Sequence, residues 1–286
     1  MFIAPMLLET SKHAFDHADY IFEPKFDGFR AILSVKQGMT TIYTRHQTVV
    51  TERFSELLNG SISDDVILDG EIVCYDPETR NVDFELVMNR FSTKHPEKVK
   101  HKSRSLPCSF MAFDVLYYQG KDLRRLPLSE RKTVLDNVLE DHDFIHQTPY
   151  VVGEGKKLFK TIQTANMEGI CAKLFNSPYQ SRRSPNWRKI INWKHTEIYL
   201  TGYLKTPAFG WLAAIKTNNR LKPVGIIEHG PSRTERQSFY QAAEPLVTDE
   251  DSKTVHLKPA IRAKVKFRNW TRKSMLRSPV FEEFIL

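Results

Sequence analysis

A lysine at position 25 stands in the segment EPKFDGFR, residues 23–30, whose composition could make it a nucleophile. Lysine reacts poorly when protonated, and desolvation or a nearby positive charge favours the reactive neutral amine. Arg30 could supply that charge, Phe26 could help to exclude water, and Gly28 lets the backbone approach a ligand closely. A pattern K-x-D-G-x-R alone fits a surface lysine in a β-hairpin at least as well. Residues further along the chain must decide between these interpretations.

Two acids and two further lysines in predicted strands, or at their ends, complete a candidate site for phosphoryl-group chemistry. They are Glu71, Glu168, Lys173 and Lys189. Carboxylates can hold a divalent metal ion, and fixed cations can bind phosphates. Each residue alone is a weak signal. Together with Lys25 they predict one lysine nucleophile, two metal-binding acids and several phosphate-binding cations.

Short strands separated by turns are expected to position these residues. The predicted strands near the site are 21–25, 30–35, 40–44, 66–68, 71–74, 109–118 and 170–175, with Asp69-Gly70 expected to break the run between 66 and 74. Residues 92–107, STKHPEKVKHKSRSLP, are polar and basic, and predict an exposed loop. After about Lys194 the pattern changes to many short strands with turns and one helix near residues 235–243, which predicts a small all-β domain.

The composition is that of a globular protein without disulfides or membrane spans. The chain has 286 residues, 41% hydrophobic and 27% charged, which predicts one large or two ordinary domains. No apolar run approaches transmembrane length, and the N-terminus lacks the pattern of a signal peptide. The three cysteines form no C-x-x-C pair. We therefore expect reduced, structural thiols and a cytoplasmic protein.

Positive charge is concentrated near the C-terminus. The net charge is +8, and no acid occurs between Lys253 and Phe281. Basic residues alternate in that interval, Lys264 and Lys266 among them, and would line one face of a strand with no acid to neutralise them. This pattern predicts a polyphosphate partner, although a solvated strand face is the alternative. Residues 92–107 and the Arg182-Arg183 pair are the next candidates for such contacts.

Six motifs occur in order along the chain: KFDGFR, YTRH, LDGEIV, FDVLYYQG, EGICAK and WRKIINWK. Together they resemble those of covalent nucleotidyltransferases, most closely the small ATP-dependent DNA ligases of bacteria and phages and the ligase modules of bacterial end-joining enzymes. The resemblance runs from about Met6 to Phe284. It implies an α+β fold with a nucleotidyltransferase (adenylation) domain of antiparallel sheets and helices, residues 1–193. An OB-fold β-barrel, residues 194–286, would follow and bind DNA.

This resemblance implies an ATP-dependent DNA ligase that seals 3′-OH/5′-phosphate nicks in duplex DNA through lysyl-AMP and AMP-DNA. Lys25 would carry the AMP, and Mg²⁺ or Mn²⁺ would bind at Glu71 and Glu168. The other residues expected to contact the nucleotide are Glu23 at the adenine amino group, Arg30 and Arg45 at the AMP, Glu71 at the ribose, Phe113 stacked on adenine, Lys173 and Lys189 at phosphates, and Arg277 at the departing pyrophosphate. Arg45 would also meet the nick 5′-phosphate, and Lys264 and Lys266 would contact DNA.

Three departures from the family pattern affect these expectations. The usual Arg-Asn-Gly after the hairpin is Arg45-His46-Gln47, which leaves the handling of the 5′-phosphate open. The last lysine motif has Ile191 in place of its second lysine, so either Lys189 suffices or Lys194 takes its place. The C-terminal Arg-x-Asp-Lys motif is reduced to Arg277.

Three other functions are alternatives to a DNA ligase: an RNA ligase, an mRNA-capping guanylyltransferase and a non-catalytic nucleic-acid-binding protein. The basic β domain favours duplex DNA over RNA, Glu23 does not suggest guanine recognition, and a binding module needs no buried acids beside a lysine. We expect a monomer on nicked duplex DNA, associated with the nucleoid and away from membranes. Ku and other repair proteins are candidate partners, and phage replication, nick repair and end joining stay open as pathways.

Overall fold

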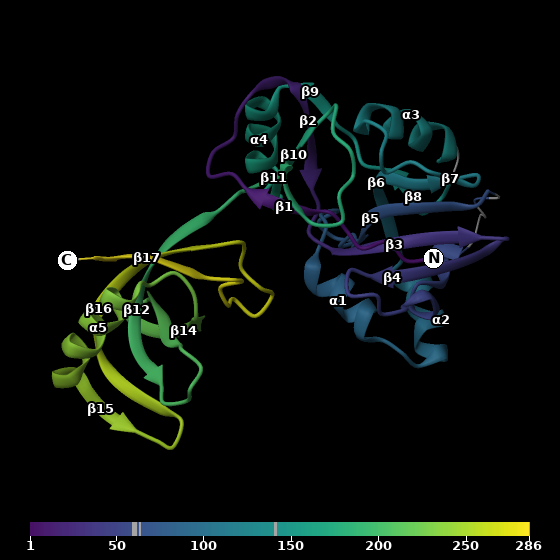
Figure 1. The fold of residues 1–286 in the computed structure, drawn as a ribbon. Helices are drawn as coiled ribbons and strands as arrows, with labels where there is room; N and C mark the ends of the chain where they lie inside the picture. The colour runs from purple at the N-terminus through teal and green to yellow at the C-terminus, as the bar shows by residue number, and fades with distance from the viewer. Residues whose placement is uncertain (59–61, 63, 140–141, 286) are drawn as a thin grey trace. The chain divides into compact units, whose positions relative to one another are not determined.

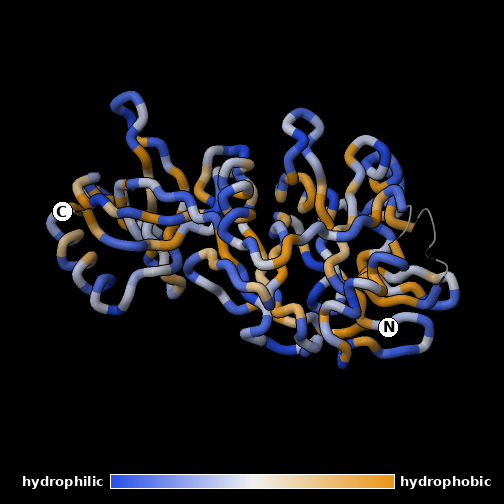
Figure 2. Tube along the Cα trace, turned by 90° about the horizontal axis from the view of Figure 1, so that it is seen from above, coloured by the Kyte–Doolittle hydropathy of each residue, from blue (hydrophilic) through white to orange (hydrophobic). Residues whose placement is uncertain are grey.

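The computed structural model describes the chain except residues 59–61, 63, 140–141 and 286, and it divides into two compact units. The first unit is Met1–Asn192 and the second is Trp193–Leu286. No helix among the described residues is long and apolar enough to span a membrane. In Figure 2 the projecting loops are mostly hydrophilic, and hydrophobic residues gather on the strands inside each unit.

One sheet of the first unit has the strand order β4-β3-β5-β6-β7, with β8 beside β6 (Figure 1). The strands are β3 (Phe29–Lys36), β4 (Met39–Thr44), β5 (Val66–Cys74), β6 (Cys108–Tyr118), β7 (Lys121–Asp122) and β8 (Ile145–Gln147). Gln37 and Gly38 both have positive φ, as a tight β3–β4 hairpin turn requires. Three helices accompany this sheet: α1 (Phe84–Ser92), α2 (Pro96–Ser105) and α3 (Leu128–Val138).

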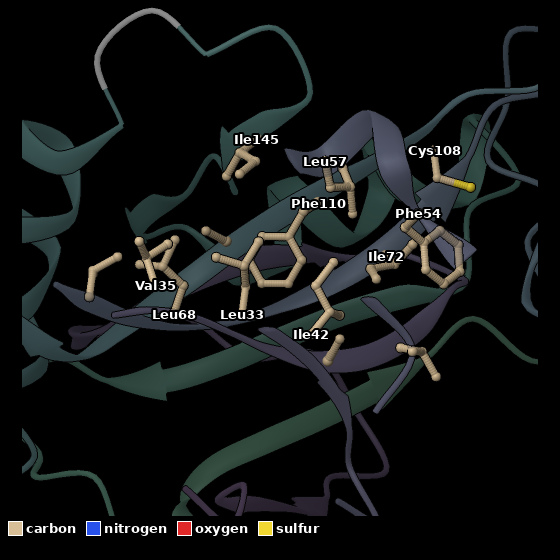
Figure 3. Close-up of a cluster of buried hydrophobic side chains, with 14 of the residues drawn as sticks. Leu33, Val35, Ile42, Phe54, Leu57, Leu68, Ile72, Cys108, Phe110 and Ile145 are labelled. Atoms are coloured by element: carbon tan, nitrogen blue, oxygen red, sulfur yellow. The ribbon is translucent and has the colours of Figure 1, made fainter. Parts of the chain in front are cut away.

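The core beneath this sheet is built from alternate residues of its strands (Figure 3). Leu33, Leu68 and Phe110 come from β3, β5 and β6 and are fully buried. Phe54 and Leu57 extend the core from two 3₁₀ turns, Thr51–Arg53 and Ser55–Leu58. This packing fixes β3, the strand after Lys25, and β5, the strand that carries Glu71.

The second sheet of the first unit holds Lys25. Its order is β1-β11-β10-β2-β9, from the strands β1 (Leu7–Thr10), β2 (His17–Lys25), β9 (Val151–Gly153), β10 (Gly169–Leu174) and β11 (Arg183–Ile191). Phe22, Ile170 and Ile190 lie on one face and pack with helix α4 (Gly155–Thr164). Because side chains alternate along strands, Lys25 and its neighbours occupy the opposite face.

The expected antiparallel sheets contain two parallel strand pairs. Strand β1 pairs with β11 in parallel, and β8 pairs with β6 in parallel. The predicted basic loop at residues 92–107 is wrong in its centre, which forms helix α2. Pro96 begins that helix and Val99 is buried, so one apolar residue is enough to anchor a short basic helix.

The second unit is a six-stranded sheet with one helix, α5 (Arg233–Ala243), capped by Ser232 and Glu235. Its strands are β12 (Lys194–Leu204), β13 (Trp211–Thr217), β14 (Arg220–Ile227), β15 (Val247–Glu250), β16 (Thr254–Phe267) and β17 (Val280–Ile285). A short 3₁₀ turn, Glu244–Leu246, follows the helix. Trp211 and Phe239 meet at the centre of its core, with ring centroids 4.4 Å apart.

Candidate active site

Lys25 and Glu168 form the centre of the candidate site. Lys25 ends β2 opposite Gly169 of β10, and Glu168 directly precedes that strand. The Nζ of Lys25 lies 2.7 Å from Oε2 of Glu168. The Lys25 side chain is 21% exposed and that of Glu168 only 2%. The amine is therefore accessible from solvent, while its carboxylate partner is buried. Gly169 makes this junction possible, because a Cβ there would lie 2.1 Å from the Ile190 carbonyl oxygen.

Glu71 is the second acid near Lys25. The loop after Lys25 lies so close to β5 that a Cβ on Gly28 would stand 2.0 Å from the Ile72 carbonyl oxygen. Burial raises the pKa of Glu71 to about 7, although the positive charges of Lys25 and Arg30 oppose this and the charge of Asp27 adds to it. This carboxyl is therefore poised to change charge near neutral pH.

Because the pKa of Glu71 is raised, the stability of the protein without metal or nucleotide should depend on pH. The folded-state pKa of about 7 exceeds the ordinary 4.5, so the stabilisation is present at acid pH and is lost as pH rises through 7. Between pH 6 and pH 8, urea denaturation should show that the wild type loses about 1 kcal/mol more unfolding free energy than Glu71→Gln. Equal pH dependence in both proteins would contradict the assigned environment of Glu71.

Lys189 adds a cation to the face that carries Lys25. It lies on β11 opposite Cys171 of β10. Burial lowers the pKa of Lys189, and the positive charges of Lys25, Arg183 and Arg45 lower it further. The charges of Lys25 and Arg45 therefore both act on Lys189. An anion such as a phosphate would relieve their mutual repulsion.

Arg30 is fixed by contacts that the sequence did not reveal. Its guanidinium donates to both Asp69 oxygens at 2.9 and 2.5 Å and to the Met6 carbonyl oxygen at 2.6 Å. Tyr179 donates to the same Asp69 carboxylate at 2.7 Å. The Arg30 guanidinium lies 5.2 Å from the Phe113 ring centroid. Arg30 is thus a rigid, nearly buried cation beside the aromatic ring expected to stack on adenine.

Glu23 lies in a buried ion cluster that sequence reasoning missed. Its Oε1 accepts from Lys132 at 2.5 Å, and its Oε2 is 2.6 Å from Nζ of Lys173. The Lys173 ammonium also lies 4.0 Å from the Phe113 ring centroid and 4.2 Å from that of Trp187. Lys173, expected at a phosphate, therefore contacts a carboxylate and two aromatic rings in this structure. Lys132 belongs to the helix opening LPLSERK, the one sequence signal that could have revealed it.

The residues at two departures from the family motifs, Ile191 and Arg277, lie in different units of the structure. Ile191, the departure in the last lysine motif, is 6% exposed and belongs to the first unit. Lys194, its suggested substitute, begins β12 in the second unit. Arg277 also lies in the second unit, where its backbone pairs with Arg268 and Asn269. Lys25 and Ile191 thus belong to the first unit, and Lys194 and Arg277 belong to the second.

The basic strand in the second unit has acidic neighbours. Residues of β16 alternate as predicted, with Ala263 and Val265 buried and the intervening basic side chains outward. The expectation that no acid neutralises them is wrong. Lys264 lies 3.6 Å from Glu283 and Lys266 lies 3.6 Å from Glu282, both on β17. Acids distant in the sequence reach the strand through sheet pairing.

The site fits a divalent metal ion with few protein ligands. In the described part of the chain no group of three His, Cys, Asp or Glu residues is placed to hold a metal. Glu71 and Glu168 are hard oxygen donors near Lys25. Mg²⁺ commonly takes one or two carboxylates and completes its shell with water and phosphate oxygens. Two carboxylates beside the cations Lys25 and Lys189 suit that pattern.

Comparison with protein-family models matches residues 5–190 to the model described as "ATP dependent DNA ligase domain". The chain is 37% identical to the SPbeta prophage-derived DNA ligase-like protein LigB of Bacillus subtilis, covering 99% of both chains. It is 27% identical to the bifunctional non-homologous end joining protein LigD of the same organism over 87% of this chain. That match spans only 44% of the longer LigD protein.

Solved structures give the same grouping. A mycobacterial DNA ligase D complexed with ATP and MES matches with a TM-score of 0.61 and 25% identity, covering 99% of this chain and 94% of that one. A Lig E DNA ligase matches with a TM-score of 0.71 over the whole of both chains at 16% identity, which shows likeness of fold alone. The mixed α/β architecture with mostly sheets is therefore that of the ligase structures.

Proposed function

Because the chain belongs to the ATP-dependent DNA ligase family, we propose that Lys25 is the residue that receives AMP from ATP. Enzymes of this family seal nicks through a lysyl-AMP intermediate. The observation that carries the assignment is the reachable Lys25 amine, 2.7 Å from the buried Glu168 carboxylate. Such a pair gives a nucleophile and a neighbouring group that can hold its proton.

In the first step, the Nζ of Lys25 would attack the α-phosphorus of ATP. The N–P bond forms, the bond from the α-phosphorus to the bridging oxygen breaks, and pyrophosphate leaves with that oxygen. Oε2 of Glu168 is placed to take the proton that Nζ must lose. Lys189 would stabilise negative charge on the phosphates. Arg277, from the second unit, is the proposed contact of the departing pyrophosphate.

Glu71 and Glu168 are the proposed residues for Mg²⁺ or Mn²⁺. Such a metal would neutralise phosphate charge and favour departure of pyrophosphate. Glu71 would also contact the ribose. Glu23 would accept from the adenine amino group, and Phe113, held beside Arg30, would stack on the base. The clamp on Arg30 supports a role in shaping the AMP pocket.

In the later steps, the nick 5′-phosphate would take AMP from Lys25, and the 3′-hydroxyl would displace that AMP. We propose that the second unit is an OB-fold barrel that binds the duplex, which its single β-sheet with one helix supports. Arg45, exposed just beyond β4, is the proposed contact of the 5′-phosphate. Lys264 and Lys266 remain proposed DNA contacts, although the ion pair of each lysine with a glutamate must break before it can contact a phosphate.

Helix α2 is a stronger candidate for contact with the DNA backbone than β16. Its Lys98 and Lys100 are exposed, and among the described residues neither forms an ion pair. Lys98→Gln/Lys100→Gln should make the slope of log affinity against log salt less negative by about 1 to 2 units for nicked duplex. Lys264→Gln/Lys266→Gln should change it less, because those cations are already paired. Fluorescence anisotropy at several salt concentrations makes the comparison, and the reverse ranking would return the interface to β16.

The pathway and partners are proposed from the relatives. A prophage-derived ligase-like protein and an end-joining protein are both similar to this chain. We propose nicked duplex DNA as the substrate of this chain. We also propose a monomer at the nucleoid in the cytoplasm, with Ku as a candidate partner. A pull-down with purified Ku, with and without DNA ends, tests that partner directly.

Mapping of the adenylylated residue tests the proposed function. The protein is incubated with ATP and Mg²⁺, digested under neutral or alkaline conditions that preserve a phosphoramidate, and examined by mass spectrometry. We expect one AMP adduct, located on Lys25. An adduct located on Lys189 instead would overturn the assignment of the nucleophile while leaving the reaction type intact.

A further inference from the structure

The ion cluster around Glu23 joins helix α3 to two strands of the candidate site, β2 and β10. Glu23 comes from β2, Lys173 from β10 and Lys132 from helix α3. The three side chains are between 1% and 2% exposed. Burying charged groups is costly unless they are paired, and this cluster places two cations on a single carboxylate.

Each lysine holds a different oxygen of Glu23. Lys132 occupies Oε1 at 2.5 Å, and Lys173 occupies Oε2 at 2.6 Å. Burial alone would raise the pKa of Glu23, but the charges of Lys132 and Lys173 outweigh it and lower the pKa. Rings restrain both ammonium groups, since Lys132 lies 5.1 Å from the Tyr150 centroid and Lys173 lies between Phe113 and Trp187. The carboxylate is thereby kept ionised and fixed in orientation.

An ionised carboxylate can only accept hydrogen bonds, and each oxygen has two lone-pair sites. One ammonium on each oxygen leaves one acceptor site on each oxygen, and either can take a further donor. Adenine presents an exocyclic amino donor at the position where guanine presents a carbonyl acceptor. A protonated Glu23 could donate to that carbonyl, whereas the ionised group repels it.

We propose that Lys132 is a positioning residue that makes Glu23 select adenine over guanine, with Lys173 as its counterpart on the other oxygen. This inference rests on the proposed function, in which Glu23 meets the base. It assigns to helix α3 a part in nucleotide choice, although that helix carries no group expected to touch ATP. Lys132 acts through Glu23 and not on the reacting atoms.

The test compares adenylylation of the full-length protein by ATP and by GTP, as kcat/KM for each labelled nucleotide. Lys132→Met keeps the length of the side chain and removes its charge. We expect the ratio of ATP to GTP to fall by about 10-fold or more, the size of one charge-assisted hydrogen bond. Lys132→Arg, which keeps a cation beside Oε1, should retain the ratio within about threefold.

A matched control separates nucleotide choice from loss of stability. Arg90→Met breaks another buried pair of the first unit, in which Arg90 lies 2.7 Å from Glu56. It should lower thermal stability and leave the ratio of ATP to GTP unchanged. If Lys132→Met does not fold, Lys132→Gln, which keeps a donor without the charge, is measured in its place and has the same two outcomes.

The possible outcomes separate the two proposals. An unchanged ratio in the Lys132 variant, with AMP still attached to Lys25, would overturn the selecting role and leave the ligase assignment standing. A changed ratio in Arg90→Met as well would show a general effect of destabilisation and would also overturn it. Failure of the wild type to attach any nucleotide would contradict the proposed function itself.

Discussion

Substitution of Lys25 by arginine is expected to lower ATP-dependent nick sealing by about 10⁴-fold or more. Arginine keeps the positive charge and most of the length, but its guanidinium does not deprotonate and so cannot act as the nucleophile. Lys25→Ala should behave alike. The measurement is single-turnover formation of labelled enzyme-AMP, followed by sealing of a nicked duplex.

A substrate that already carries AMP supplies the control for this variant. Sealing of pre-adenylylated nicked DNA needs attack by the 3′-hydroxyl and does not need a lysine nucleophile. Lys25→Arg should therefore lose far less activity on that substrate than on ATP with nicked DNA. Lys157→Arg, on the exposed face of helix α4, should retain both activities. Enzyme-AMP formation by Lys25→Ala at the wild-type rate would refute the assignment.

The second large effect is expected at Glu168. Glu168→Gln keeps the shape of the side chain but removes the charge 2.7 Å from Lys25 and one of the two carboxylates proposed for the metal. Loss of one such group at a phosphoryl-transfer centre typically costs about 10²- to 10³-fold in rate. The measurement is the single-turnover rate of enzyme-AMP formation over a range of Mg²⁺ concentrations. The concentration of Mg²⁺ at half-maximal rate should rise together with the loss of rate.

Glu154→Gln is the matched control for Glu168→Gln. Glu154 is also paired with a lysine, Lys157, but that pair is exposed on the surface. Surface pairs contribute little, so this variant should react at the wild-type rate. If Glu168→Gln formed enzyme-AMP as fast as the wild type, neither proton transfer nor metal binding could be assigned to Glu168.

The group around Lys25 could be predicted because each member lies in a short motif with its own strand. Lys25, Glu71, Glu168 and Lys189 lie within or beside strands whose alternation is visible locally. The pairing of these strands then follows the family pattern. The separation of the β-rich region after Lys194 also shows in the sequence, as a change in the spacing of turns.

Contacts between distant segments could not be predicted in this way. Lys132 and Glu23 are 109 positions apart, and Tyr179 and Asp69 are 110 positions apart. Nothing local in the sequence relates such partners. The same limit explains the error about the basic strand, because Glu282 and Glu283 reach β16 only through its pairing with β17.

Helix α2 shows a different limit. Its sequence is dominated by lysine, histidine and serine, with only Val99 buried, so hydrophobic periodicity is almost absent. Lysine and arginine are nevertheless good helix formers, and the proline at the first position favours a helix start. A polar composition alone therefore does not distinguish this helix from a loop.

Sealing of a nicked DNA duplex by the purified full-length protein tests the central claim most directly. The duplex carries a labelled 5′-phosphate at the nick, and parallel reactions receive ATP with Mg²⁺, NAD with Mg²⁺, or ATP without metal. We expect ligated product with ATP and Mg²⁺ alone, and much less product from a nicked RNA duplex. Product with NAD in place of ATP, or no product from protein that carries AMP on Lys25, would contradict the assignment of an ATP-dependent DNA ligase.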